Sequence, residues 1–197
     1  MSVHANRLAI IVPSICFCWI GRLVYAEEAT SSPQQFQTKA SFSLNVESST
    51  NLKKGPNTLQ TSSAFATYTN EFFGGKTNAL KVQFFSQPIT EDDRVKLLKN
   101  DTGEISRQGY AALVLFLDDR NQVWQVNLTY TIPGTTVVRT VAGNREELTK
   151  HFSDCHFDQH RLRLKSKGSY RSAEATEALT LAWDLDLNLP VFDQVKK

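Results

Sequence analysis

Apolar and polar residues alternate strictly over residues 36–47, where Phe42 lies in the middle of the apolar face. The same alternation returns over residues 179–189, in which five leucines and Trp183 occupy every second position. A period of two over so many residues is typical of a long strand with one solvated face. We therefore predict amphipathic strands at both ends of a β domain.

A hairpin is predicted in the middle of the chain. Residues 110–117 are continuously apolar, as in a strand that is covered on both faces, and turn-forming residues follow at 118–121. Alternation then resumes from Trp124 to Ile132 and ends at Pro133. Further strands are predicted at residues 61–68, 79–86, 137–142 and 161–165, which makes eight in total.

Two short helices are predicted between strands. Thr90 precedes three acidic residues, and Asn144 precedes Glu147 at the spacing of a helix start. Many strands with few helices favour an all-β fold, namely an antiparallel two-sheet β-sandwich with one or two short crossover helices. The pattern leaves both a jelly-roll and an immunoglobulin-like topology open.

The first 26 residues have the layout of a secretory signal peptide. Arg7 precedes a largely apolar run from Leu8 to Ile20, and small or compact residues precede a cleavage site after Ala26. We therefore expect the mature protein to be secreted or periplasmic. The apolar run is too short to span a membrane, so no transmembrane segment is expected in the mature chain.

The mature chain is expected to form one domain. Residues 27–35 are polar and predict a flexible lead-in, residues 36–192 form the predicted domain, and residues 193–197 are expected to fray. Cys155 is the one cysteine after residue 26, so an apolar core must stabilise the fold without an internal disulfide. Burial is the expected state of Cys155; a Cys155-linked dimer and a metal-bound sulfur are the alternatives.

Charge disfavours nucleic acid as a partner. The precursor has 22 basic and 20 acidic residues, and loss of Arg7 and Arg22 with the signal peptide leaves equal numbers. A neutral chain lacks the general positive field that attracts nucleic acid, although local patches remain open.

A glycine-containing loop is the first candidate binding site. Two aromatic residues precede a glycine pair there and could form an exposed platform for a sugar ring, a peptide or a protein partner. The residues of this candidate site are Phe72, Phe73, Gly74, Gly75 and Lys76. In the alternative interpretation, one phenylalanine caps the end of the sandwich and the glycines form a turn.

A histidine cluster is the second candidate site, because the three histidines of the mature chain all lie within residues 151–160. Imidazole and thiolate groups suit zinc or copper, and carboxylates can complete the coordination. The candidate ligands are His151, Asp154, Cys155, His156, Asp158 and His160. Their spacing matches neither a zinc finger nor a blue-copper site, and the alternative is a solvated connection that Phe152 and Phe157 anchor to the core.

These observations support a ranking of functions. Nucleophile-elbow and protease signatures are missing from the sequence, which disfavours an enzyme. The leading hypothesis is an exported, non-enzymatic β-sandwich that binds a protein, carbohydrate or small-molecule ligand through its end loops. A zinc- or copper-binding protein is the alternative, and a secreted hydrolase is the third.

Overall fold

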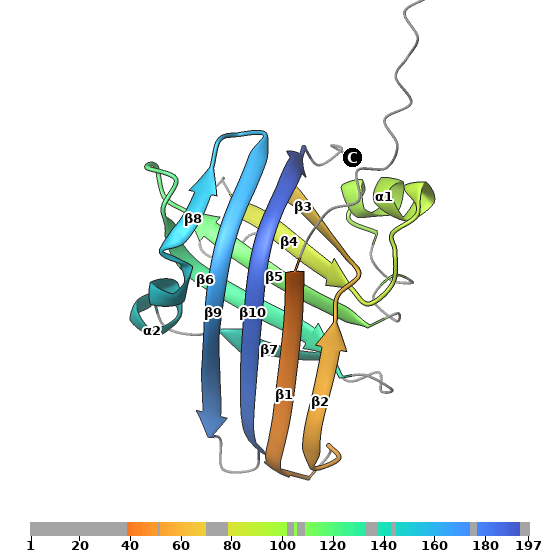
Figure 1. Ribbon diagram of the computed structural model, residues 1–197, viewed down its shortest axis with the longest axis vertical. Coiled ribbons are helices and arrows are strands. Elements are labelled where there is room, and N and C mark those ends of the chain that lie inside the picture. The colour runs from red at the N-terminus through yellow and green to blue at the C-terminus, as the bar shows by residue number, and fades with distance from the viewer. Residues whose placement is uncertain are drawn as a thin grey trace, which may run out of the picture. The chain divides into compact units, whose positions relative to one another are not determined.

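The computed structural model describes residues 39–50, 52–69, 79–101, 105, 109–132, 138–142, 145–173 and 177–193 (Figure 1). These residues form an all-β protein with short helices, as the hydrophobic pattern predicts. The elements are β1 (Lys39–Ser49), β2 (Gly55–Gln60), β3 (Ser63–Thr69), β4 (Ala79–Phe85), α1 (Glu91–Leu98), β5 (Tyr110–Leu117), β6 (Val123–Thr131), β7 (Val138–Ala142), α2 (Arg145–Thr149), a 3-10 turn (Lys150–Phe152), β8 (Asp154–Phe157), β9 (Arg161–Ala173) and β10 (Glu177–Phe192).

The strands belong to two antiparallel groups. The first half-sheet has the order β2-β1-β10-β9-β8, and the second half-sheet is the meander β3-β4-β5-β6-β7. A short parallel pairing of Val191 and Phe192 with Ala66 and Thr67 joins the two groups into one ten-stranded sheet, in which β9 and β8 branch from β10. This order confirms an all-β fold but does not confirm the predicted sandwich or either of its topologies.

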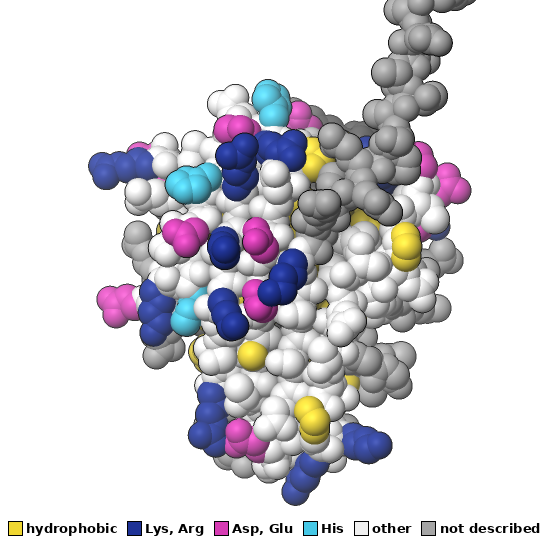
Figure 2. All heavy atoms as spheres, in the orientation of Figure 1, with side chains coloured by type: hydrophobic (Ala, Val, Ile, Leu, Met, Phe, Trp, Pro, Cys, Tyr) yellow, Lys and Arg dark blue, Asp and Glu magenta, His cyan; other side chains and the backbone are white. Residues whose placement is uncertain are grey.

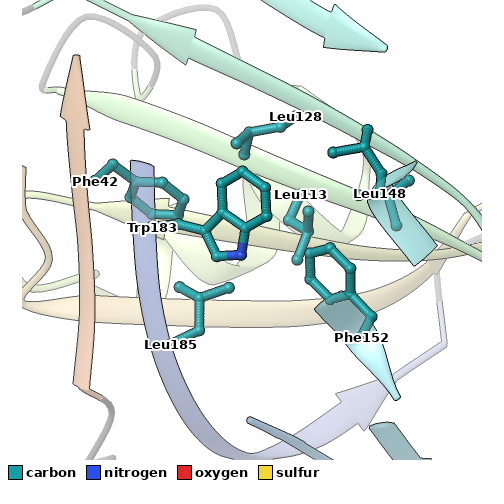
Figure 3. Close-up of a pocket in the computed structure, with 8 residues that line it drawn as sticks. Phe42, Leu113, Leu128, Leu148, Phe152, Trp183 and Leu185 are labelled. Carbon is teal, nitrogen blue, oxygen red and sulfur yellow. The ribbon is translucent and has the colours of Figure 1, made fainter. Parts of the chain in front are cut away.

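The two half-sheets share one apolar core. In Figure 1 the strands β4 to β7 run obliquely behind β9, β10 and β1. Phe42 of β1 meets Phe84 of β4 edge to face, with 5.1 Å between ring centroids. A cavity of about 10 Å³ remains beside Trp183 and is lined by apolar side chains (Figure 3). It has room for at most one water molecule, so the interior offers no ligand site here.

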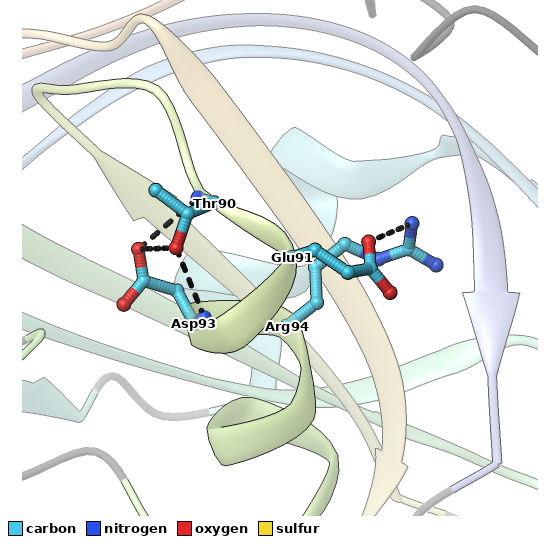
Figure 4. Close-up of polar contacts among 4 residues, drawn as sticks. All are labelled: Thr90, Glu91, Asp93 and Arg94. Atoms are coloured by element: carbon cyan, nitrogen blue, oxygen red, sulfur yellow. Dashed lines mark hydrogen bonds and ion pairs between the residues drawn. The ribbon is translucent and has the colours of Figure 1, made fainter.

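Helix α1 lies on the outer face of the second half-sheet. Thr90 caps its start: the Thr90 hydroxyl accepts a hydrogen bond from the Asp93 backbone N–H at 3.2 Å, and the Asp93 carboxylate accepts one from the Thr90 N–H at 3.1 Å (Figure 4). Leu97 is 2% exposed and packs in a second apolar cluster with Phe65 and Phe85. The predicted helix start at Thr90 is therefore confirmed.

The far end of α1 is tied to the sheet. Asn100 adopts a left-handed conformation with φ 57°, and the N–H groups of Asn100 and Asp101 donate to the carbonyls of Leu97 and Lys96. The Asn100 side chain also accepts a hydrogen bond from the ammonium group of Lys81 in β4, at 3.3 Å. Within the ranges that the structure describes, no helix is long and apolar enough to cross a membrane.

Candidate binding cleft

A cleft of about 640 Å³ opens between the β5–β6 turn and the segment that runs from α2 to β8. This volume lies within the range of about 300–1,000 Å³ typical of small-molecule sites. The turn contributes residues 120–123, and the second segment contributes Glu146, Thr149, Lys150, Phe152, Ser153, Cys155, His156 and Phe157. The cleft therefore joins part of the predicted histidine cluster to a turn about 30 residues earlier in the chain.

The first wall is a hydrogen-bonded turn. The Asp118 carboxylate accepts hydrogen bonds from the backbone N–H groups of Arg120 and Gln122, at 2.8 and 2.9 Å. Asn121 adopts φ 58°, a left-handed conformation that asparagine tolerates better than most residues. These bonds hold the backbone that carries Arg120 in one conformation, which limits the entropy lost when a ligand binds.

The second wall is anchored in the core. Leu148 and Phe152 are each 3% exposed, and the Phe152 ring stacks on Trp183 with 5.9 Å between centroids. These two residues lie four positions apart across α2 and the 3-10 turn, as the apolar spacing predicts, and the predicted helix start at Asn144 lies outside the described residues. The exposed residues Glu146 and Lys150 lie on the same segment and line the cleft.

The cleft has an apolar floor and a polar rim. Along β8, Cys155 and Phe157 are half-buried and pack against the core, whereas Asp154 and His156 are exposed. Phe157 meets the ring of Tyr68 edge to face, with 5.5 Å between centroids. The floor consists of the half-buried or buried residues Val123, Phe152, Cys155 and Phe157, and the rim includes the exposed residues Arg120, Glu146, Lys150 and His156.

The thiol of Cys155 is protonated at neutral pH. Burial raises its pKa to about 11, because the charged thiolate is poorly solvated in the floor of the cleft. A thiol nucleophile reacts in its deprotonated form, which is scarce at neutral pH when the pKa is about 11. Cys155 therefore contributes apolar surface to this cleft rather than reactivity.

The six predicted metal ligands lie in different local environments. His151 packs edge-on against Trp183, with 5.5 Å between ring centroids. The Asp158 carboxylate accepts hydrogen bonds from the N–H groups of His160 and Arg161 in the β8–β9 turn, at 3.2 and 2.7 Å. Among the described residues, no group of three histidine, cysteine or acidic side chains could hold a metal ion. Binding of zinc or copper stays a prediction.

Other predicted features lie outside the described residues. These are the loop residues Phe72, Phe73, Gly74, Gly75 and Lys76, the signal peptide at residues 1–26, and the lead-in at residues 27–35. The loop also stays a prediction as a binding platform.

The sequence interpretation missed the cationic residues of the rim. The local pattern around Arg120 predicts only a turn, and the pattern around Lys150 predicts only a connecting helix. Neither residue belongs to a motif. Each of the two residues lies next to a segment with buried apolar residues. That arrangement is too common to identify a binding site.

Comparison with known proteins gives no match for this chain, either among protein-family models, curated proteins or solved structures. The chemistry of the cleft is therefore the basis for a functional conclusion. Its rim combines the cations Arg120 and Lys150 and the imidazole of His156 with one carboxylate, Glu146. An apolar floor below a mainly basic rim suits a molecule with an apolar body and an acidic group.

Proposed function

We propose that the protein is an exported, non-enzymatic β-sandwich. It binds a small amphipathic acid in the cleft between the β5–β6 turn and the segment from α2 to β8. The observation that carries this proposal is the cleft of about 640 Å³, with its half-buried floor and its basic rim. The shared apolar core between the two half-sheets supports the sandwich. The N-terminal signal pattern supports export.

Two features support noncovalent binding. The raised pKa of Cys155 keeps the thiol neutral, so the floor offers apolar contact and no ready nucleophile. Arg120 and Lys150 are exposed, so they remain hydrated until a carboxylate ligand brings an opposite charge to the rim. A charge-assisted hydrogen bond to either residue would orient the acidic group outward and the apolar body inward.

Calorimetry with decanoate tests the proposal. Decanoate has an apolar chain and a carboxylate, and decylamine has the same chain with the opposite charge. We expect decanoate to bind and decylamine to bind at least about tenfold more weakly, since the rim favours an anion. Equal binding of the two would overturn the charge assignment, and binding of neither would overturn the choice of an alkyl acid as ligand.

A double variant connects the measurement to the cleft. Arg120→Ser with Lys150→Ser removes two exposed cations from the rim and should weaken decanoate binding about tenfold. Lys53→Ser with Lys54→Ser is the matched control, because it removes the same charge from two exposed residues between β1 and β2. The control should bind as the unmodified chain does; equal losses in both variants would count against the cleft.

A further inference from the structure

The outer face of β9 carries a row of basic side chains. Leu162, Leu164 and Ser166 of this strand are buried, so the residues between them point outward. The outward side chains include Arg161, Arg163, Lys165, Lys167 and Arg171. Successive outward positions on a strand are about 6.6 Å apart. Figure 2 shows several dark blue side chains on the face of the molecule that contains β9.

Carboxylates from the neighbouring strands interrupt this row. Asp186 of β10 lies opposite Lys165 of β9 and Lys39 of β1, and Asp154 of β8 lies on the other side of Lys165. Ion pairs join Asp184 to Lys39 at 3.2 Å and to Lys167 at 3.8 Å. Acidic groups are thus distributed among the basic ones rather than separated from them.

The balance of charge on this face is positive. Among the described residues of these strands, the outward cations are Lys39, Arg161, Arg163, Lys165, Lys167 and Arg171, and the carboxylates are Glu47, Asp154, Asp184 and Asp186, which is six against four, or a net charge of +2. Arg171 is paired with Glu47 at 2.6 Å. Arg163 and Lys165 are exposed, and neither has an ion pair with another described residue. They are therefore free to meet an anion.

A groove of about 570 Å³ lies on the same face beside the row. Ser41 and Ser43 of β1, Thr58 of β2 and Ser169 of β9 line it, together with Lys167 and Asp184. The hydroxyl groups can donate and accept hydrogen bonds, and the carboxylate of Asp184 can accept them. The groove thus places neutral polar groups next to a cation of the row.

We propose that this face binds a linear acidic polysaccharide whose sugar residues carry carboxylate groups. Such a chain alternates anionic groups, which the arginine and lysine side chains would bind, with hydroxyl groups, which Asp184 and the serines would bind. A DNA duplex carries one negative charge per about 1.7 Å of its axis, and an anionic membrane presents charge over its whole surface, so the interspersed aspartates would repel either one more than a chain with one carboxylate per sugar. The site is separate from the cleft, and its ligand is of a different class.

The test uses a short oligogalacturonate and the same oligosaccharide after complete methyl esterification. Methyl esterification removes the charge of the carboxylates and keeps the sugar hydroxyl groups, so it isolates the role of the basic row. We expect the acid form to bind, with an affinity that falls as salt is added, and the ester to show no measurable binding. Equal binding of the two forms, or no binding of the acid form at low salt, would overturn the proposal.

The double variant Arg163→Ser with Lys165→Ser locates the site. Both side chains are exposed, so the variant should keep the melting temperature of the unmodified chain and bind the oligogalacturonate about tenfold more weakly. The control Lys53→Ser with Lys54→Ser removes equal charge outside the row and should leave the affinity unchanged. Unchanged binding in the β9 variant, with folding confirmed by its melting temperature, would contradict the proposal.

Two further measurements test other classes of ligand and the independence of this site from the cleft. A DNA duplex or phosphatidylglycerol vesicles should bind more weakly than the oligogalacturonate; equal or tighter binding of either would overturn the choice of a polysaccharide. The cleft variant Arg120→Ser with Lys150→Ser should bind the oligogalacturonate normally. Loss of binding in that variant would contradict a separate site on β9.

Discussion

The two half-sheets differ in what covers their outer faces. Along β10 of the first half-sheet, residues 179–189 alternate between buried side chains and more exposed ones. Along β4 of the second half-sheet, all seven residues are buried, and these include Lys81 and Gln83. Part of this difference comes from α1, because its apolar cluster packs against Phe85 and Asn100 at its end bonds to Lys81. A strand with strict alternation therefore has one solvated face, and a strand that lacks alternation, such as β4, is covered on both of its faces.

Polar residues under this cover need partners. The Lys81 ammonium group is 3.3 Å from the Asn100 side-chain oxygen at the end of α1, and the Gln83 amide is 3.5 Å from the Tyr110 hydroxyl. A buried polar group without a hydrogen bond would cost about 1–3 kcal/mol. On the first half-sheet, the outward charged groups such as Asp186 are exposed to solvent, so they need no buried partner.

The largest expected effect comes from removing the cover of the second half-sheet. Leu97→Ala should lower the free energy of unfolding by about 2–4 kcal/mol, because Leu97 is 2% exposed within the α1 cluster. Val95→Ala is the control on the same helix; Val95 is 42% exposed, and its loss should cost less than about 0.5 kcal/mol. Urea unfolding measures both. Similar small effects in the two variants would show that α1 does not cover the sheet.

A smaller effect is expected at the inner face of the first half-sheet. A Cβ atom at Gly168 would lie 2.5 Å from Cζ2 of Trp183 and 2.9 Å from the His151 ring. Gly168→Ala should therefore lower the free energy of unfolding by about 1–3 kcal/mol and shift the tryptophan fluorescence. Ser169→Ala, at the next and exposed position, should change neither quantity. A stability gain for Gly168→Ala would mean that this contact is loose.

The cap of α1 should have a moderate effect. Thr90→Ala removes the hydroxyl that bonds to Asp93 and should lower the free energy of unfolding by about 1 kcal/mol, whereas Thr90→Ser should retain most of it. The hydrogen bonds from Thr90 lower the pKa of Asp93, so their contribution is present above the ordinary carboxyl pKa and is lost as pH falls through the folded value. An NMR titration should show a higher Asp93 pKa in Thr90→Ala; an unchanged pKa would contradict this assignment.

Cys155 lies in the cleft between the β5–β6 turn and the α2–β8 segment, and the effect predicted there is on thiol reactivity rather than on stability. Its pKa of about 11 predicts reaction with a disulfide reagent at pH 8 at least about tenfold slower than that of a free cysteine, with acceleration as pH approaches 11. A nonreducing gel should show the same monomer band for the unmodified chain and Cys155→Ser. Fast reaction at pH 8 or a disulfide-linked dimer would contradict burial of the thiol.

Local pattern predicted much of the fold. The bounds of β5 match the predicted strand at residues 110–117, and α1 begins at its predicted cap. Two strands were not predicted: β2, with the sequence GPNTLQ, and β8, with the sequence DCHF. Neither has enough apolar residues to indicate a strand alone; each forms because an adjacent strand supplies hydrogen-bonding partners. In the same way, pairing with β10 extends β9 as far as Ala173, well beyond the end at residue 165 that the sequence predicts for this strand.

The sequence by itself determined the all-β class, the solvated faces of the long strands and the start of α1, because these depend on the spacing of neighbouring residues. Only the tertiary structure decided which distant segments meet. It brought Arg120 and Lys150 to one cleft, set Lys165 opposite Asp186 of β10, and packed His151 against Trp183. Such contacts arise from pairing between strands far apart in the chain, and no local pattern specifies that pairing.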